Sequence, residues 1–214
     1  MSACGYFRTE GGDFPSVGSP EYRVLSADDY YCPDEAEEDV PAIAWDKLYH
    51  KSLFDTLRYP VGKLHEDEFT TYLAVYRAGK VVVTREALYA YYQNPVGIML
   101  SKWTPRKLHI LEATENQIAF ARETGNLRLL KKAVRQYIYS TYEQIGFAKQ
   151  WDDPGRGRLL KILRRKLREG LRQGKDFDLF PLCRERSWMY EEAYPVKPFW
   201  WLYGKLHRGG ERQE

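Results

Sequence analysis

The sequence predicts an α/β fold, with a small mixed sheet and helices in the first half and a helical extension in the second half. Two observations lead to this prediction. Before Trp103, β-branched and aromatic runs alternate with stretches of helical periodicity, which is typical of α/β proteins. After Trp103, apolar residues recur mainly at helical spacing. We therefore expect an α/β domain over residues 1–103 and a helical extension over residues 104–214.

Short strand candidates open the chain at residues 2–8 and 22–25, with a glycine-containing turn between them. Residues 28–39 are rich in acids and contain a proline, so we expect irregular structure there. The next stretch, residues 46–54, fits a helix or a strand-to-helix junction.

A helix is predicted from Glu66, because apolar residues then recur at helical spacing until Gly79 supplies a C-terminal stop. A β-branched run at residues 80–84 and an aromatic run at residues 88–92 predict two further strands.

Helices fill the second half. Thr104 and Pro105 predict an N-cap with proline at the first helical position, and Gly125 closes that helix before Asn126 opens the next. A third helix carries leucines at every fourth position, over residues 156–173.

Charge is distributed unevenly. Residues 1–40 hold ten acids and two bases, whereas residues 156–173 hold eight bases and one acid, so the two segments suit different partners or each other. The three cysteines are odd in number and form no C-x-x-C pair, which favours reduced thiols in a cytoplasmic setting. The histidines lack metal-ligand spacing, and no secretory signal or membrane span is predicted.

Four motifs follow one another in the first half: W-D-K-L-Y at 45–49, Y-P-x-G at 59–62, H-E-D-E at 65–68 and Y-Y-Q-N at 91–94. Their order resembles the acceptor half of family 2 glycosyltransferases of the GT-A fold, of the bacterial type that builds capsular and surface polysaccharides. The resemblance covers roughly residues 1–100. It implies a partial GT-A domain, the second and acceptor-side half.

The resemblance assigns the catalytic base to Asp67, which would take the proton from an acceptor hydroxyl during inverting transfer. It assigns substrate binding to five residues: Trp45, Asp46, Lys47, His65 and Glu66. The sequence departs from the family at two positions, with Asp46 in place of the usual asparagine and Gln93 where arginine is common.

The residues alone leave simpler roles open. Acids such as Asp67 in a first helical turn stabilise the helix dipole. Trp45 is either a stacking wall for a sugar or a core aromatic, and Lys47 either meets an anion or is solvated. His65 fits a local hydrogen-bonding role better than a ligand role, since no second histidine lies near it in the sequence.

The donor side of the family is missing from the sequence. The family binds a divalent cation, Mg²⁺ or Mn²⁺, through an acidic D-x-D motif that precedes the acceptor half. Ser26-Ala27-Asp28-Asp29 lacks the first acid of that motif, and Asp176-Phe177-Asp178 lies in the helical extension. We therefore predict no metal ligands in this chain and expect a truncated product or a separate nucleotide-binding chain. Alone, the chain is expected to bind a nucleotide sugar weakly or not at all.

The basic helix at 156–173 has three interpretations: a solvated helix docked through its leucines, a helix on an anionic membrane surface, or a nucleic-acid binder. The aromatic run at 199–203 supports the second. No recognised module accompanies the charge, so no nucleic-acid partner is predicted.

The predicted function is transfer of a sugar from a nucleotide-sugar donor to a saccharide or lipid-linked acceptor in cell-surface polysaccharide synthesis. The predicted location is cytoplasmic, peripheral at the inner face of the membrane. The alternative is a non-catalytic interaction or membrane-surface adaptor that keeps a glycosyltransferase remnant.

Overall fold

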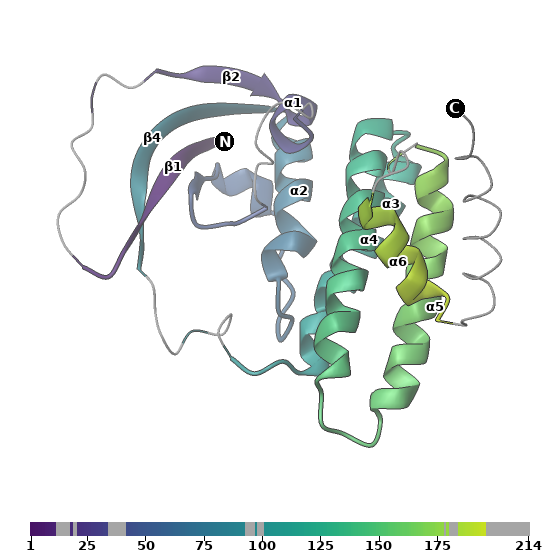
Figure 1. Cartoon of the computed structure of the whole chain (residues 1–214). Coiled ribbons are helices and arrows are strands. Elements are labelled where there is room, and N and C mark those ends of the chain that lie inside the picture. The colour runs from purple at the N-terminus through teal and green to yellow at the C-terminus, as the bar shows by residue number, and fades with distance from the viewer. Residues whose placement is uncertain are drawn as a thin grey trace, which may run out of the picture. The chain divides into compact units, whose positions relative to one another are not determined.

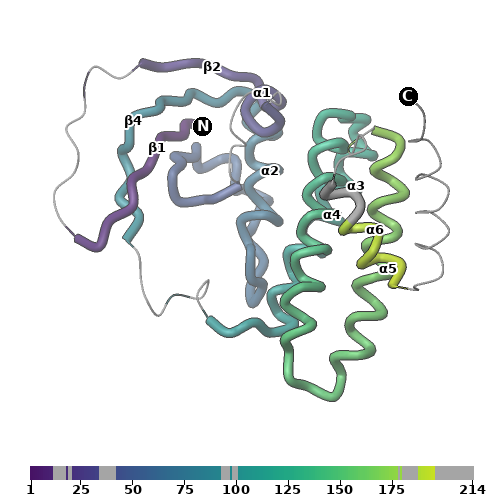
Figure 2. Tube along the Cα trace, viewed as in Figure 1, coloured from purple at the N-terminus to yellow at the C-terminus, as the bar shows by residue number. Residues whose placement is uncertain are grey.

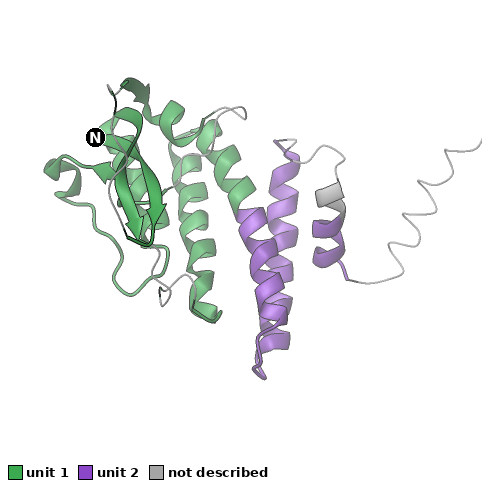
Figure 3. Ribbon diagram, turned by 60° about the vertical axis from the view of Figure 1, so that its left-hand side comes forward, with its two compact units in different colours: residues 1–136 green, residues 137–214 purple. Residues whose placement is uncertain are grey.

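The computed structural model describes residues 1–11, 18, 21–33, 42–92, 97, 101–177, 179 and 184–195, the last segment from Trp188 on with its side chains. The chain divides into two compact units, residues 1–136 and 137–214 (Figure 3). The boundary between residues 103 and 104, predicted from the change to helical periodicity after Trp103, stays a prediction; the two compact units divide later, between residues 136 and 137.

Unit 1 contains, in chain order, β1 (Ser2–Thr9), β2 (Arg23–Ser26), α1 (Ala27–Tyr31), β3 (Lys47–Leu48), the 3₁₀ helix η1 (Lys51–Phe54), α2 (Glu66–Ala78), β4 (Lys80–Tyr92), the 3₁₀ helix η3 (Pro105–Leu108) and α3 (His109–Glu123). Helix α4 (Leu127–Lys149) runs from unit 1 into unit 2, which also contains α5 (Arg156–Lys175) and α6 (Arg184–Ala193). The predicted α/β class is confirmed. None of the helices among the described residues combines the length and the apolar character needed to cross a membrane.

The sheet is small and mixed, with strand order β2-β4-β1-β3. Strands β1 and β4 are parallel and run side by side through a shared curve, while β2 and β3 are antiparallel to their neighbours (Figures 1 and 2). The core of unit 1 combines Ala3 and Val81 from the sheet with buried side chains of α1, α2, the end of α3 and the start of α4. The sheet thereby fixes the chain on both sides of α2.

Residues 80–84 and 88–92 belong to one strand, not to the two strands predicted from the sequence. Register shifts in the β1–β4 pairing on both sides of Gly5 add residues to β4 and let one strand bend without ending. At this point a Cβ on Gly5 would lie 2.7 Å from the carbonyl oxygen of Arg85. Only glycine allows the two backbones to approach so closely.

Residues 28–31 are helical, which corrects the prediction of irregular structure at 28–39; residues 34–39 lie outside the described residues. The helix begins because Ser26 acts as N-cap: its Oγ accepts a hydrogen bond from the Asp29 backbone N–H at 3.1 Å. The other helix signals are largely confirmed, since Gly79 and Gly125 follow α2 and α3 with positive φ angles of 69° and 68°.

The start of α3 differs slightly from the prediction. Pro105 begins a 3₁₀ turn that leads into the α-helix, and the Thr104 side chain makes no capping hydrogen bond. Asn126 does cap α4, because its Oδ1 accepts from the Leu129 backbone N–H at 2.9 Å.

Helix α5 buries the predicted leucine face, and Leu163, Leu167 and Leu171 are at most 3% exposed. Gly170 lets α5 approach α4 closely, because a Cβ there would lie 2.9 Å from Ile138 Cγ1 and 3.0 Å from Tyr137 Cδ1. The same helix therefore has a fixed buried face, which determines where its basic side chains point.

Replacing Gly170 with valine is expected to lower the free energy of unfolding by about 1–3 kcal/mol, because the added atoms overfill this helix contact. The matched control is Gly146→Ala in α4, where nothing lies within 4 Å of the added Cβ. That control is expected to raise the free energy of unfolding by about 0.5–1 kcal/mol through helix propensity. Both values are measured by chemical denaturation, and equal effects at the two glycines would contradict the close packing.

Candidate functional site

Residues 62–64, which lead into α2, are held in place by contacts with η3 and the first turn of α3. Gly62 lies in a turn with φ of 78°, a conformation that favours glycine. Three contacts tie this turn down: Arg106 Nη2 to Gly62 O at 3.2 Å, Lys63 Nζ to Glu112 Oε2 at 2.5 Å, and the Leu64 backbone N–H to His109 Nδ1 at 3.0 Å. The Y-P-x-G motif therefore sets the direction from which the chain enters α2.

His65 is the only non-glycine residue with positive φ among the described residues, at φ 58° and ψ 41°. This left-handed conformation costs an L-residue about 1–2 kcal/mol. Burial lowers the pKa of His65, and the nearby carboxylates of Asp67 and Glu66 partly offset that effect. His65 thus turns the chain into α2 as an uncharged side chain at neutral pH.

Asp67 lies half-buried in the first turn of α2, and its Oδ1 accepts a hydrogen bond from the Glu68 backbone N–H at 2.9 Å. Burial raises the pKa of Asp67 above its ordinary value of 3.8; the hydrogen bond opposes this shift and the neighbouring Glu66 charge adds to it. Glu66 itself is exposed. A carboxylate with a raised pKa is a better proton acceptor, which is the property that a general base requires.

Glu68, which the sequence did not single out, anchors this turn. Its two carboxylate oxygens accept from Gln117 Nε2 of α3 and Gln136 Nε2 of α4, each at 3.0 Å. Gln117 also donates to the Glu68 backbone carbonyl at 2.9 Å. These bonds join α2 to two later helices and hold the adjacent Asp67 in place. Burial raises the pKa of Glu68, and the amide donors oppose that shift.

Asp46 and Lys47 form a buried ion pair, with 2.5 Å between Lys47 Nζ and Asp46 Oδ1 and side chains that are 7% and 0% exposed. Lys47 Nζ also donates to the Ile43 carbonyl at 2.6 Å. Burial lowers the pKa of Lys47 and raises that of Asp46, while their pairing opposes both shifts. The interpretation of Lys47 as a solvated side chain is therefore wrong.

The ammonium group of Lys47 also interacts electrostatically with Asp67, the candidate base. The Asp67 carboxylate contributes to raising the pKa of Lys47, though less than Asp46 does. The structure thus brings Asp67 close enough to the buried pair for its charge to act on Lys47.

Trp45 belongs to an aromatic cluster on the sheet. Its ring stacks on Tyr89 and Tyr91 of β4, with centroids 4.4 and 5.0 Å away, and meets the edge of Tyr6 of β1 at 5.0 Å. All four rings keep some exposure to solvent. Trp45 is therefore partly packed against other rings and partly exposed to solvent. Both predicted roles, a stacking wall for a sugar and a core aromatic, remain compatible with this position.

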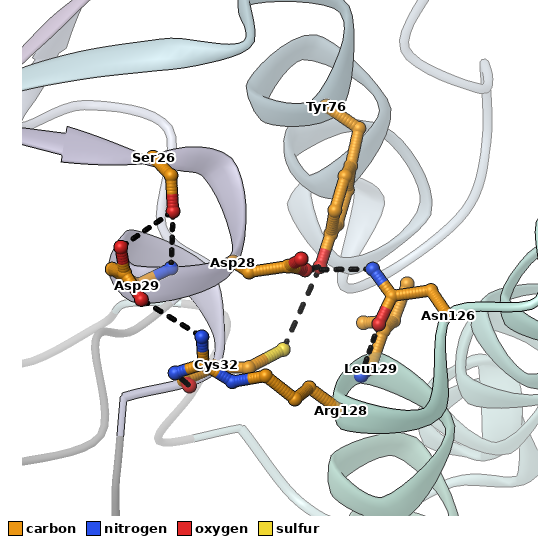
Figure 4. A network of polar contacts seen from close by, with 8 residues as sticks. All are labelled: Ser26, Asp28, Asp29, Cys32, Tyr76, Asn126, Arg128 and Leu129. Atoms are coloured by element: carbon orange, nitrogen blue, oxygen red, sulfur yellow. Dashed lines mark hydrogen bonds and ion pairs between the residues drawn. The ribbon is translucent and has the colours of Figure 1, made fainter.

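Asp28 and Asp29 connect α1 to α2 and to the start of α4 (Figure 4). Asp28 Oδ1 accepts hydrogen bonds from Tyr76 Oη of α2 at 2.7 Å and from Asn126 Nδ2 at the start of α4 at 2.6 Å. Asp29 pairs with Arg128 Nη1 at 2.8 Å, and Arg128 also donates to the Cys32 carbonyl. Sequence reasoning missed this network because its members lie far apart along the chain.

This arrangement gives the two aspartates a structural role in place of a metal-binding one. Within the described ranges, no group of three or more His, Cys, Asp or Glu side chains is placed to hold a metal ion. The other candidate motif includes Asp178, which lies outside the described residues. The divalent cation remains an expectation from the family resemblance alone.

No protein-family model matches the chain. Part of the chain is similar to the glycosyltransferase GlyA of Streptococcus pneumoniae serotype 4, with 34% identity over 83 residues. The match covers 38% of this chain and 12% of that protein, so it spans a small fraction of the relative's length. This partial similarity supports a relationship with glycosyltransferases at that coarse level.

The hydrogen-bond network around Asp28 can be tested by removing a single oxygen atom from one of its members. Tyr76→Phe removes only the hydroxyl that donates to Asp28, and we expect it to lower the free energy of unfolding by about 1–3 kcal/mol, as for a hydrogen bond to a charged group. Tyr30→Phe is the matched control, because the Tyr30 hydroxyl is buried and has no hydrogen-bond partner among the described residues. Its loss should be neutral or stabilising. Chemical denaturation measures both, and an equal cost at both tyrosines would contradict the network.

Proposed function

We propose that this chain forms the acceptor side of a family 2-type, GT-A glycosyltransferase. The enzyme would move a sugar from a nucleotide-sugar donor to a saccharide or lipid-linked acceptor in cell-surface polysaccharide synthesis. The partial similarity to a glycosyltransferase supports the class of reaction, and the motif order supports the family. The observation that carries the proposal is the half-buried Asp67 carboxylate, held at the start of α2 with a raised pKa.

The proposed role of Asp67 follows from its geometry. One carboxylate oxygen, Oδ1, is held by the Glu68 backbone N–H, and Oδ2 makes no hydrogen bond to the rest of the described chain. Oδ2 would accept the proton of an acceptor hydroxyl while the hydroxyl oxygen bonds to the anomeric carbon. The bond from that carbon to the nucleoside diphosphate breaks, and the diphosphate leaves with the electron pair.

The remaining predicted residues would support this step from two sides. The buried pair of Asp46 and Lys47 would position the strand beside the base, with the Lys47 charge favouring the ionised form of Asp67. Trp45 would offer an aromatic face to an acceptor sugar. His65 and Glu66 would flank the acceptor, because they precede Asp67 directly.

The donor requires groups that the described residues do not gather. Asp28 and Asp29 are engaged in joining α1, α2 and α4, so they do not fit the divalent cation that the resemblance implies. We therefore propose that the nucleotide and its Mg²⁺ or Mn²⁺ are bound by residues outside this chain segment, in the same protein or in a partner chain.

Asp67→Asn tests the base in the intact enzyme that contains this chain. We expect sugar transfer to fall by about 10²–10⁴-fold, because an amide cannot accept the hydroxyl proton. The matched control is Glu66→Gln, which removes the adjacent exposed acid and should change the rate far less. Transfer is measured with a radiolabelled nucleotide sugar. Unchanged transfer with Asp67→Asn would remove Asp67 from the reaction.

The pH dependence of transfer gives an independent check. A base acts in its deprotonated form, so activity should fall as the pH drops through the pKa of Asp67. Because burial raises that pKa, the acidic limb of kcat/KM should lie above 3.8, the ordinary value for an aspartate. Glu66→Gln removes a charge that adds to this shift and should move the limb to lower pH. A limb that does not respond to this substitution would contradict the assignment.

A further inference from the structure

Unit 2 contains a pocket that the proposed function does not use. Helices α5 and α6 lie side by side (Figure 1). Their side chains line an open pocket of about 380 Å³. A volume of this size lies within the range of small-molecule sites. Four bases and two tyrosines supply most of its lining: Arg165, Arg168, Arg172, Lys175, Tyr190 and Tyr194.

The four bases lie on one helical face because of their spacing. They recur at intervals of three, four and three residues, which places them in one stripe along α5. The leucine face and Gly170 fix the rotation of α5 against α4, so the basic stripe cannot turn into the core. The concentration of positive charge in the pocket therefore follows from how the helix packs.

Two of these bases are held by the protein and two are available. Arg168 donates to the Ala193 carbonyl at 2.7 Å, and Arg172 pairs with Glu169 at 2.7 Å. Arg165 and Lys175 make no hydrogen bond or ion pair to any other part of the described chain. The held bases give the pocket a defined shape, and the others supply charge that an anion can neutralise.

The opposite wall is aromatic. Tyr190 and Tyr194 of the α6 region have nearly parallel rings, with centroids 6.3 Å apart, and the Arg168 guanidinium lies 5.7 Å from the Tyr194 ring centre. Glu192, between them, accepts from Arg164 Nη2 at 3.0 Å and also pairs with Lys149, which anchors α6 to α5 and α4. The wall is thus attached to the basic helix by ion pairs outside the pocket.

We propose that this pocket binds the phosphate group of an organic phosphate, with the basic stripe of α5 around the anion and the tyrosines against the organic part. Arginine side chains present paired N–H donors that match phosphate oxygens, and a phosphate with two charges is attracted by several bases together. The single acid in the lining, Glu169, belongs to an exposed pair with Arg172. Such pairs contribute little, so a phosphate can displace the carboxylate.

The phosphate has two chemical sources, a soluble organic phosphate or a phospholipid headgroup. The first is tested by calorimetry of the whole chain with pyrophosphate and with adenosine diphosphate, without metal. The second is tested by co-sedimentation with vesicles that contain phosphatidic acid, against neutral phosphatidylcholine vesicles. In both arms binding should weaken as salt rises, because the attraction is electrostatic.

Matched variants separate the pocket from general charge attraction. Arg165→Gln with Lys175→Gln removes the two available bases of the pocket, and we expect about a tenfold loss of affinity. Arg158→Gln with Lys161→Gln removes the same charge from the same face of α5 outside the pocket, and should change affinity less than twofold. Both variants should keep the helical circular-dichroism spectrum of the parent chain.

The outcomes are distinct. Binding of the soluble phosphates that only the pocket variant weakens supports a soluble ligand. Binding restricted to acidic vesicles and weakened mainly by the pocket variant supports a headgroup. No binding in either arm, or equal losses with both variants, overturns the proposal. The result is independent of the proposed glycosyltransferase function, since Asp67→Asn should leave phosphate binding unchanged.

Discussion

The carboxylate of Glu68 is the constraint on which the candidate site depends. A partly buried acid without partners would be costly, and here two glutamine amides from α3 and α4 supply its hydrogen bonds. The first turn of α2 is therefore fixed by helices that come much later in the chain. Asp67 precedes this anchor directly, and its Oδ1 accepts a hydrogen bond from the Glu68 backbone N–H, so its carboxylate is held in place through one oxygen only.

This anchoring has an electrostatic cost. Burial raises the pKa of both Glu68 and Asp67, so the folded chain binds protons to them more tightly than the unfolded chain does. Their contribution to stability is therefore most favourable below their unfolded pKa values and is lost as the pH rises through the raised ones. Ionisation of the two acids therefore destabilises the folded chain relative to its protonated form, which fits a functional more than a stabilising role for Asp67.

Several structural features that depend on residues close together in the sequence were predicted correctly. The strand at the N-terminus, the helix ending at Gly79 and the leucine face of α5 all follow from short-range patterns. The roles of Glu68 and Asp28 could not be predicted, because their partners Gln136 and Asn126 lie 68 and 98 residues away. The single bent strand β4 was also missed, because its continuity depends on a close approach to β1 at Gly5.

Charged residues of the same type have different roles in this protein, depending on whether the fold already pairs their side chains. Asp28 and Asp29 resemble part of a metal motif, yet their oxygens are used by Tyr76, Asn126 and Arg128. Asp67 keeps one oxygen available, and the α5 stripe keeps two bases available. Charges satisfied inside the fold hold it together, whereas charges held in position but left without a partner are the ones that can meet a ligand.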